Sequence, residues 1–212
     1  MTPFRGAKGQ ILEGGMRVPM IVQWPSQIPA GNVENGIMSH LDWFPTLIAA
    51  AGNSNIGNEL KTGKTINDKS YKVHLDGYNQ LDMLTGNGES NRDTIYYFAQ
   101  DKFGAVRVGD YKYRFTDQPN GWLGETVDLT WPTITNLRLD PFERAGISDN
   151  SDEGSFSSFN FYLYEFWRFV DGQQKVQELV ETFIEFPPMQ DPASFNLDSV
   201  KKKIEKMRAL GD

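Results

Sequence analysis

A single short apolar segment limits what this chain can fold into. Residues 18–24 form a nearly continuous apolar run, which ends at Pro25. Such a run predicts a strand that is buried on both faces of a parallel sheet. The sequence that follows predicts a helix up to residue 51, with Pro45 in its first turn and Gly52 as its C-terminal stop. One strand and one helix make one repeat of an α/β fold, and one repeat cannot form a sheet.

The middle of the chain has a different pattern. Residues 53–92 are polar and rich in Asn, Gly, Lys and Thr, which predicts a long irregular connection. Four short β-rich runs follow and predict an antiparallel sheet of three or four strands. The runs are residues 94–98, 104–108, 111–115 and 135–139. Gly109-Asp110 predicts a two-residue hairpin turn, and the alternation of aromatic residues with Lys112 and Arg114 indicates a sheet with one covered face.

Helices are predicted for the last part of the chain. A helical stretch is expected over residues 156–184, and Phe186-Pro187-Pro188 would end it. Its apolar part, residues 159–170, is expected to be buried between the sheet and another body. A last helix is predicted over residues 198–208. The pattern as a whole predicts an α/β fold class that becomes α+β in its C-terminal part.

Charge and cysteine content exclude several functions. The net charge of −7 over 212 residues argues against non-specific nucleic-acid binding and against a polybasic membrane anchor. The longest apolar runs are far shorter than the roughly 20 residues that span a bilayer, so no membrane association is expected. The chain contains no cysteine, which excludes a disulfide, a thiolate metal site and a cysteine nucleophile within it. The N-terminal residues carry no apolar segment of the kind found in signal peptides.

A glycine-rich loop precedes the predicted strand. It runs from Arg5 to Pro19, RGAKGQILEGGMRVP, and contains a single lysine, Lys8. Lysine is a good point-charge partner for a tetrahedral oxyanion such as sulfate or phosphate. Sites for such anions in open α/β sheets lie beyond the strand ends, where this loop would lie. Lys8 is therefore the candidate substrate-binding residue, and we expect Glu13 and Arg17 to brace the loop.

The other polar residues predict structural roles. Neither His40 nor His74 is surrounded by metal-ligand spacing or by a Ser-His-Asp arrangement, so both are predicted to be structural. We expect no metal site within the chain. Three acidic residues in turn-like contexts are expected to cap turns or to pair with nearby arginines. These acids are Asp76, Asp140 and Glu143, and the arginines are Arg138 and Arg144.

Six blocks of the sequence resemble type I sulfatases, the arylsulfatases of the alkaline phosphatase superfamily. The first block is TPFRGAKGQILEGGMRVPMIVQWPSQIPAG, residues 2–31. It is followed, in collinear order, by HLDWFPTLIAAAG, KVHLDGYNQLDMLTG, AVRVGDYKYRF, NLRLDPFERA and FIEFPPMQDPASFNLDSV. The last blocks resemble a bacterial arylsulfatase group in particular, and the six together cover nearly the whole chain.

The resemblance implies a division of the chain at residue 93. Residues 1–93 would be the C-terminal remnant of the catalytic, alkaline-phosphatase-like α/β domain, with its last strand–helix unit and a long connection. Residues 94–212 would be the sulfatase C-terminal subdomain, a small antiparallel sheet packed with helices.

The resemblance also implies a function for Lys8. In the family, the lysine of the RGxKGxxxEGG loop contacts the sulfate group of the substrate. Ala7 stands where glycine is usual, and Leu12 where an aromatic residue is common. Family catalysis further needs a CxPxR cysteine that is oxidised to formylglycine, and a calcium ion held by Asp and Asn side chains. Both belong to sequence N-terminal to the Lys8 loop, and this chain has no CxPxR motif.

We therefore predict the C-terminal portion of an arylsulfatase that is inactive by itself, with calcium and formylglycine supplied in the complete enzyme. Its partners would be a sulfate-ester substrate and either the missing N-terminal catalytic region or a second copy, bound through residues 18–51. Two alternatives stay open: a phosphate or phosphonate ester hydrolase fragment of the same superfamily, and a non-catalytic binding or assembly module. A periplasmic or secreted parent would fit the family, but the sequence does not fix the compartment.

Overall fold

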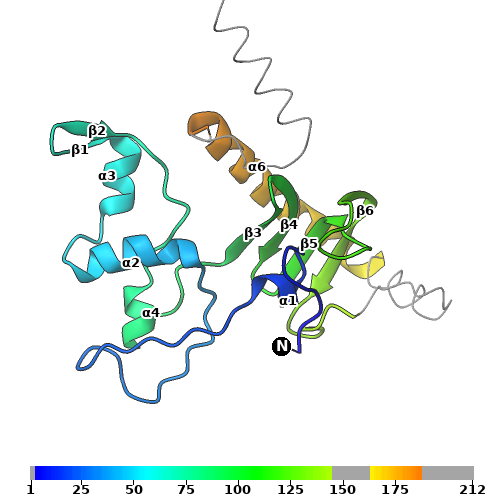
Figure 1. Ribbon diagram of the computed structural model, residues 1–212, viewed down its shortest axis with the longest axis horizontal. Coiled ribbons are helices and arrows are strands. Elements are labelled where there is room, and N and C mark those ends of the chain that lie inside the picture. Colours follow the sequence, from blue (N-terminus) through cyan, green and yellow to red (C-terminus); the bar gives the residue numbers. More distant parts are fainter. Residues whose placement is uncertain (1–2, 145–162, 188–212) are drawn as a thin grey trace, which may run out of the picture.

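The structure, a computed structural model, describes residues 3–144 and 163–187. Within these residues the elements form two groups (Figure 1): a four-stranded antiparallel sheet with a helix against it, and a helical group that carries a small β-hairpin. The mixture of helices and antiparallel strands confirms the predicted fold class. Across the sheet the order is β3 (Thr94–Ala99), β4 (Lys102–Val108), β5 (Tyr111–Asp117) and β6 (Val127–Asn136).

The sheet confirms the first three predicted β runs, whereas the fourth run is largely wrong. Gly109-Asp110 joins β4 to β5 as a two-residue connection, which is the predicted hairpin. β6 extends from Val127 to Asn136, so it shares only residues 135 and 136 with the run predicted over residues 135–139. Polar residues and Pro132 interrupt the apolar pattern of this strand. Because β6 is an edge strand, it tolerates a proline that has no N–H to donate.

Both faces of the sheet are covered, although the alternation in β5 predicted only one covered face. On one face, helix α6 (Phe169–Glu185) packs over an apolar cluster that includes Tyr113. On the other face, Ile11 from the N-terminal loop packs on Tyr97. Lys112 points to this second face and is only 1% exposed. The prediction was wrong because the second cover comes from a loop that is far away in the sequence.

The helical group is built from six short elements between residues 40 and 85. They are η1 (His40–Asp42), α2 (Trp43–Ala50), α3 (Ile56–Thr62), β1 (Lys64–Ile66), β2 (Lys69–Tyr71) and α4 (Leu81–Thr85). Helix α2 confirms the helix predicted from Pro45 and Gly52. The long irregular connection predicted over residues 53–92 was wrong, because α3, the β1–β2 hairpin and α4 lie within it. Helix α3 buries only Ile56 and Leu60, and polar residues surround this short i, i+4 pair in the sequence.

Residues 18–24 do not form the predicted strand. They run as extended chain after α1 (Glu13–Met16), no described strand pairs with them, and Ile21 is 97% exposed. The apolar pattern of a buried strand is present. A strand, however, needs a neighbour to satisfy its backbone hydrogen-bonding groups, and the described part of the chain supplies none.

Helix α6 confirms the later part of the predicted helical stretch. It ends at Glu185, directly before the Phe-Pro-Pro sequence that was expected to end it. The N-terminal part of that stretch and the helix predicted over residues 198–208 lie outside the described residues. Among the described helices, none combines the length and the apolar character needed to cross a membrane.

The burial predicted for residues 159–170 is wrong for the described part of that range. Trp167 is 56% exposed and Val170 is 53% exposed. The short helix η2 (Phe166–Arg168) lies at the edge of the sheet, where the Phe166 ring packs 5.7 Å from the ring of Trp131 in β6. Phe166 and Trp167 are thus largely exposed, whereas Phe169 is partly buried against the apolar cluster that includes Tyr113.

Candidate functional site

Lys8 lies in a tight turn on the surface. The N–H of Gln10 donates to the carbonyl oxygen of Ala7 (3.0 Å), which closes the turn around Lys8 and Gly9. Gly9 has φ +83°, a left-handed value that residues with a Cβ rarely adopt. The side chain of Gln10 accepts from the N–H of Ala7 (2.8 Å) and donates to the carbonyl oxygen of Gln118 (3.2 Å). The turn is thus fixed within itself and to the segment that follows β5.

Gly14 and Gly15 let the loop fold back closely on itself. The N–H of Gly14 donates to the carbonyl oxygen of Arg5 (2.6 Å). A Cβ at Gly14 would lie 2.5 Å from the carbonyl oxygen of Phe4, and a Cβ at Gly15 would lie 2.2 Å from that of Gln10. Any larger residue would push these backbone segments apart, so the Glu-Gly-Gly sequence is required by backbone packing.

A buried charged cluster lies beneath the loop. Nζ of Lys112 is 3.0 Å from Oε1 of Glu13 and 2.9 Å from Oε1 of Glu143. The same Nζ donates to the carbonyl oxygen of Ile11 (2.7 Å). Oε2 of Glu143 accepts from the backbone N–H of Glu13 (2.6 Å), and the hydroxyl of Tyr97 donates to Oε1 of Glu13 (2.8 Å). One lysine on β5 therefore joins the loop to the segment after β6.

This environment sets the charge of Glu13. Burial opposes ionisation, but the charge of Lys112 and the hydrogen bonds from Lys112 and Tyr97 outweigh it, so the pKa of Glu13 is lowered. Burial raises the pKa of Tyr97 well above its usual value, and the charge of Glu13 raises it further. Glu13 is therefore ionised and Tyr97 is neutral at neutral pH. A buried carboxylate is stable only with partners of this kind.

Arg17 and Lys8 lie nearer the surface. The guanidinium of Arg17 is 4.1 Å from the centre of the Phe4 ring, and its Nε is 3.9 Å from Oε2 of Glu13. Nζ of Lys8 is 4.8 Å from the ring centre of Trp122, in the β5–β6 connection. The structure thus brings Glu13 and Arg17 together, and it leaves Lys8 exposed on Trp122, where a dissolved anion can reach the ammonium.

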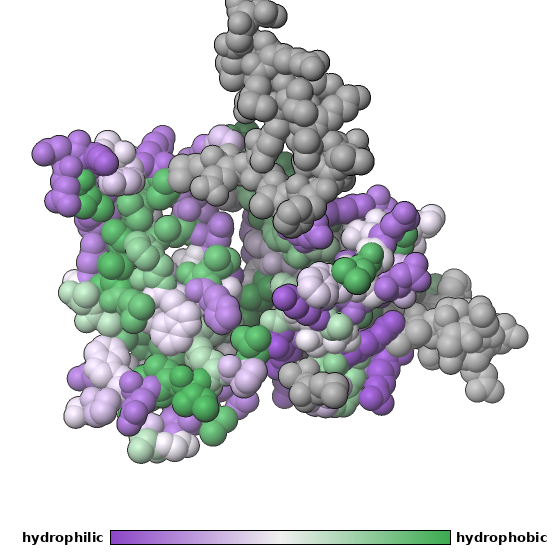
Figure 2. Space-filling view, in the orientation of Figure 1, coloured by the Kyte–Doolittle hydropathy of each residue, from purple (hydrophilic) through white to green (hydrophobic). Residues whose placement is uncertain are grey.

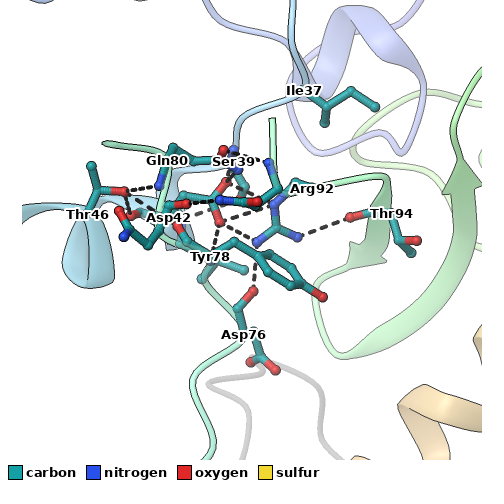
Figure 3. Close-up of polar contacts among 12 residues, drawn as sticks. Ile37, Ser39, Asp42, Thr46, Asp76, Tyr78, Gln80, Arg92 and Thr94 are labelled. Atoms are coloured by element: carbon teal, nitrogen blue, oxygen red, sulfur yellow. Dashed lines mark hydrogen bonds and ion pairs between the residues drawn. The ribbon is translucent and has the colours of Figure 1, made fainter. Parts of the chain in front are cut away.

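A second buried ion pair ties the helical group to the sheet (Figure 3). Asp42 is fully buried, and Nε of Arg92 lies 2.9 Å from its Oδ2. Asp42 also accepts from the backbone N–H groups of Ser39 (2.8 Å) and Tyr78 (2.7 Å), while Arg92 donates to the carbonyl oxygen of Thr94 (3.0 Å). Burial opposes ionisation of Asp42, but the hydrogen bonds from Arg92 and the backbone outweigh it and lower its pKa.

Residues 1–53, which contain the Lys8 loop, match the family model described as Sulfatase. The chain is 32% identical to N-acetylgalactosamine-6-sulfatase from Canis lupus familiaris over 171 residues, which cover 71% of this chain and 30% of that protein. It is also 32% identical to arylsulfatase A from Bos taurus over 166 residues, which cover 70% of this chain and 29% of that protein. The chain belongs to the type I sulfatase family.

The fold of the chain supports the same family assignment as its sequence. It is similar to the crystal structure of the PsFucS1 sulfatase from Pseudoalteromonas sp., with a TM-score of 0.69 and 26% identity over 89% of this chain and 34% of that chain. The chain therefore spans about a third or less of the length of these relatives. The narrower likeness to a bacterial group stays a prediction, because the curated relatives named here are animal proteins.

The partners of two acidic residues differ from the predicted ones. Glu143 was expected to cap a turn or to pair with Arg138 or Arg144, but its carboxylate binds Lys112, because β5 directs that lysine into the covered face of the sheet. The carboxylate of Asp76 lies 3.2 Å from Nδ1 of His74, and not beside Arg138 or Arg144. Sequence proximity to the arginines was thus a poor guide to the partners.

Two residues that hold the fold together, Lys112 and Asp42, were not predicted from the sequence. Lys112 carried no signal, since a lysine in an alternating strand usually faces solvent. Asp42 did carry one: Ser39 and Asp42 have the spacing of a capping box, and the structure forms that box at the start of η1. Its ion pair with Arg92 joins residues 50 positions apart, which spacing alone does not reveal.

The described side chains do not fit the calcium and formylglycine that the sulfatase family implies for the complete enzyme. The sequence has no cysteine. Within residues 3–144 and 163–187, no group of three or more His, Asp or Glu side chains could hold a metal ion. What the chain offers chemically is an exposed cation, Lys8, on a loop held by buried charges.

Proposed function

We propose that this chain is the C-terminal portion of an arylsulfatase whose parent hydrolyses sulfate esters, and that it contributes Lys8 as a sulfate contact. The observation that carries the proposal is the family match over residues 1–53, which includes the Lys8 loop, in a chain that covers only 30% of a relative's length. The absence of cysteine from the sequence supports a division of the catalytic groups between this chain and sequence outside it.

Lys8 would act through its charge. Hydrolysis of a sulfate ester develops negative charge on the oxygens around sulfur, and a fixed cation stabilises that charge in the transition state. In the complete enzyme, formylglycine would supply the nucleophile and calcium the Lewis acid. This sequence has no cysteine from which formylglycine could form, and the described residues contain no cluster of three or more His, Asp or Glu side chains that could hold a metal ion. Because a lysine binds phosphate as readily as sulfate, substrate class depends on groups beyond Lys8. Alone, the chain does not hydrolyse the ester.

Glu13 and Arg17 would support the loop without touching substrate. Glu13 is 1% exposed, so a substrate cannot reach its carboxylate. Its contacts with Lys112 and Tyr97 anchor the loop to the sheet. Arg17 would cover the same carboxylate from the solvent side, where it also lies on the ring of Phe4.

The N-terminal catalytic region would bind this chain through residues 18–51. Figure 2 shows apolar side chains gathered over the helical group. In residues 18–51 several large apolar side chains are at least 45% exposed. They are Val18, Met20, Ile21, Val33, Leu41, Phe44 and Leu47. Exposed apolar side chains that gather in one region are typical of a surface that binds a partner. A neighbouring strand would both cover them and satisfy the open backbone of residues 18–24.

The test is to express this chain joined to the coding sequence upstream of it in its source, together with an enzyme that generates formylglycine. We expect hydrolysis of 4-nitrophenyl sulfate by the joined protein and none by the chain alone. Lys8→Met should lower kcat about 100-fold, whereas the matched control Lys69→Met, on the exposed strand β2, should leave it unchanged.

Three outcomes would contradict the proposal. Activity of the 212-residue chain alone would overturn the division of catalytic groups. An upstream sequence without a CxPxR motif would overturn the assignment to a sulfatase parent. A joined protein that hydrolyses 4-nitrophenyl phosphate, and not the sulfate, would favour the phosphate-ester alternative.

A further inference from the structure

The connection between β5 and β6 packs against the turn that carries Lys8. A Cβ at Gly9 would lie 1.9 Å from Cδ1 of Trp122, so the indole fills the space directly beside the Gly9 backbone. The hydrogen bond from Gln10 to the carbonyl oxygen of Gln118 (3.2 Å) joins the same two segments. The position of the Lys8 turn is therefore set by a segment more than a hundred residues away.

Trp122 also contacts the charged end of Lys8. Nζ lies 4.8 Å from the ring centre, within the range of a cation–π interaction. A lysine side chain on a surface otherwise samples many rotamers. Trp122 is 47% exposed and Leu123 is 93% exposed, so this side of the turn is open to solvent. The ring restricts the ammonium without hiding it.

We propose that Trp122 is a positioning residue, which holds the ammonium of Lys8 ready for the sulfate group of the substrate. This inference rests on the proposed function of Lys8. A carboxylate partner would neutralise the lysine and compete with sulfate for its N–H donors. An aromatic ring does neither, because its face attracts the cation and leaves the donors free. Holding the ammonium in place before the substrate arrives reduces the freedom that is lost on binding.

The first experiment measures the contact by NMR in the isolated 212-residue chain. In the ¹H–¹³C spectrum, the ε-methylene of Lys8 is identified by its loss in Lys8→Arg. We expect this signal upfield of the other lysines, because the ε-methylene is bonded to Nζ, which lies 4.8 Å from the ring centre of Trp122. Trp122→Leu should return it to the common position, Trp122→Phe should keep part of the shift, and the neighbouring control Leu123→Ala should leave it unchanged. A Lys8 signal that Trp122→Leu does not move would overturn the inference.

The second experiment measures kcat and KM for 4-nitrophenyl sulfate in the joined protein. Trp122→Leu should lower kcat/KM about 2- to 5-fold, the size expected of an exposed cation–π contact. Trp122→Phe should recover most of that loss, and Leu123→Ala should cause none. If Trp122 acts through Lys8, then Trp122→Leu causes no further loss in a Lys8→Met background.

The outcomes separate the two proposals. If Lys8→Met does not lower activity, the sulfate contact proposed for Lys8 is wrong. If Lys8→Met lowers it and Trp122→Leu does not, only the positioning by Trp122 is wrong. An equal loss from Trp122→Leu with and without Lys8 would show that Trp122 acts independently of the lysine, which also overturns the inference. Denaturation of each variant shows whether a loss reflects unfolding instead.

Discussion

Residues 5–17 and residues 18–24 are neighbours in the sequence, yet the structure treats them differently. The first segment is folded tightly onto the sheet, with Glu13 at 1% exposed. The second is extended and open, with Ile21 at 97% exposed. Both carry strong sequence patterns, a glycine-rich loop and an apolar run. The difference lies in whether the described chain contains the partner that each pattern requires.

The loop finds its partners at distant positions of the same chain. Lys112 and Glu143 enclose Glu13, and Trp122 packs on Gly9. The apolar run needs strands on either side, which the described residues do not supply. A segment that packs against its own chain can therefore directly precede one that has no strand partner among the described residues, and substitutions in the two should have different effects.

The largest effect should come from Lys112→Met. It preserves the length of the side chain but leaves Glu13 and Glu143 buried without their cation. Loss of one partner from a buried ion pair typically lowers the free energy of unfolding by about 3–5 kcal/mol. Urea denaturation followed by circular dichroism measures this. The control Lys102→Met removes a solvent-exposed pair with Asp128 (2.7 Å) and should change stability by less than about 1 kcal/mol. If the two substitutions lowered the free energy of unfolding equally, the buried charged cluster would stabilise the fold no more than an exposed ion pair does.

The next largest effect should come from acid, which should lower the free energy of unfolding by protonating Glu13 and Asp42. The pKa values of Glu13 and Asp42 are both lowered, from ordinary values of 4.5 and 3.8. A carboxylate with a lowered pKa stabilises the fold fully above its ordinary pKa and loses that contribution as pH falls through the lowered value. The free energy of unfolding should therefore decrease as pH falls below about 4.5. Urea denaturation between neutral and acidic pH tests this, and Glu13→Gln should flatten the dependence. A free energy that rises on acidification would have the wrong sign.

Much of this fold can be predicted from local patterns. Helix α2 and strands β3 to β5 have clear periods or turn residues, and the glycine spacing indicates a tight loop around Lys8. What the sequence does not reveal are contacts between distant residues. Lys112 looks solvent-exposed until residues 5–17 cover its face of the sheet, and the ion pair of Asp42 with Arg92 joins two separate elements. Tertiary packing determines where these charged side chains lie, and the periodicity of the sequence does not predict it.

A smaller effect should separate Gly9 from Gly31. Both glycines have left-handed φ, +83° and +75°, so substitution by alanine strains the backbone similarly, by about 1–2 kcal/mol. A Cβ at Gly31 meets nothing within 4 Å, whereas one at Gly9 meets Trp122. Gly9→Ala should therefore lower the free energy of unfolding more than Gly31→Ala, and it should also move the Lys8 NMR signal. If both variants lose the same free energy of unfolding, the Trp122 side chain moves away from the new Cβ at little cost. Its contact with Gly9 then does not hold the turn in place.

The smallest effect on stability, and the sharpest test of the open segment, is Ile21→Asp. Because Ile21 is 97% exposed in the chain alone, the substitution should change the free energy of unfolding by less than about 0.5 kcal/mol. The same aspartate should prevent any partner from covering residues 18–24, since a charge buried in an apolar interface is unfavourable. Sedimentation velocity would report loss of self-association, and co-purification would report loss of binding to the N-terminal catalytic region. Leu139→Asp, at an exposed leucine after β6, is the matched control and should leave both intact. If Ile21→Asp destabilises the isolated chain as Lys112→Met does, the segment already packs against its own chain, and the contrast with the Lys8 loop disappears.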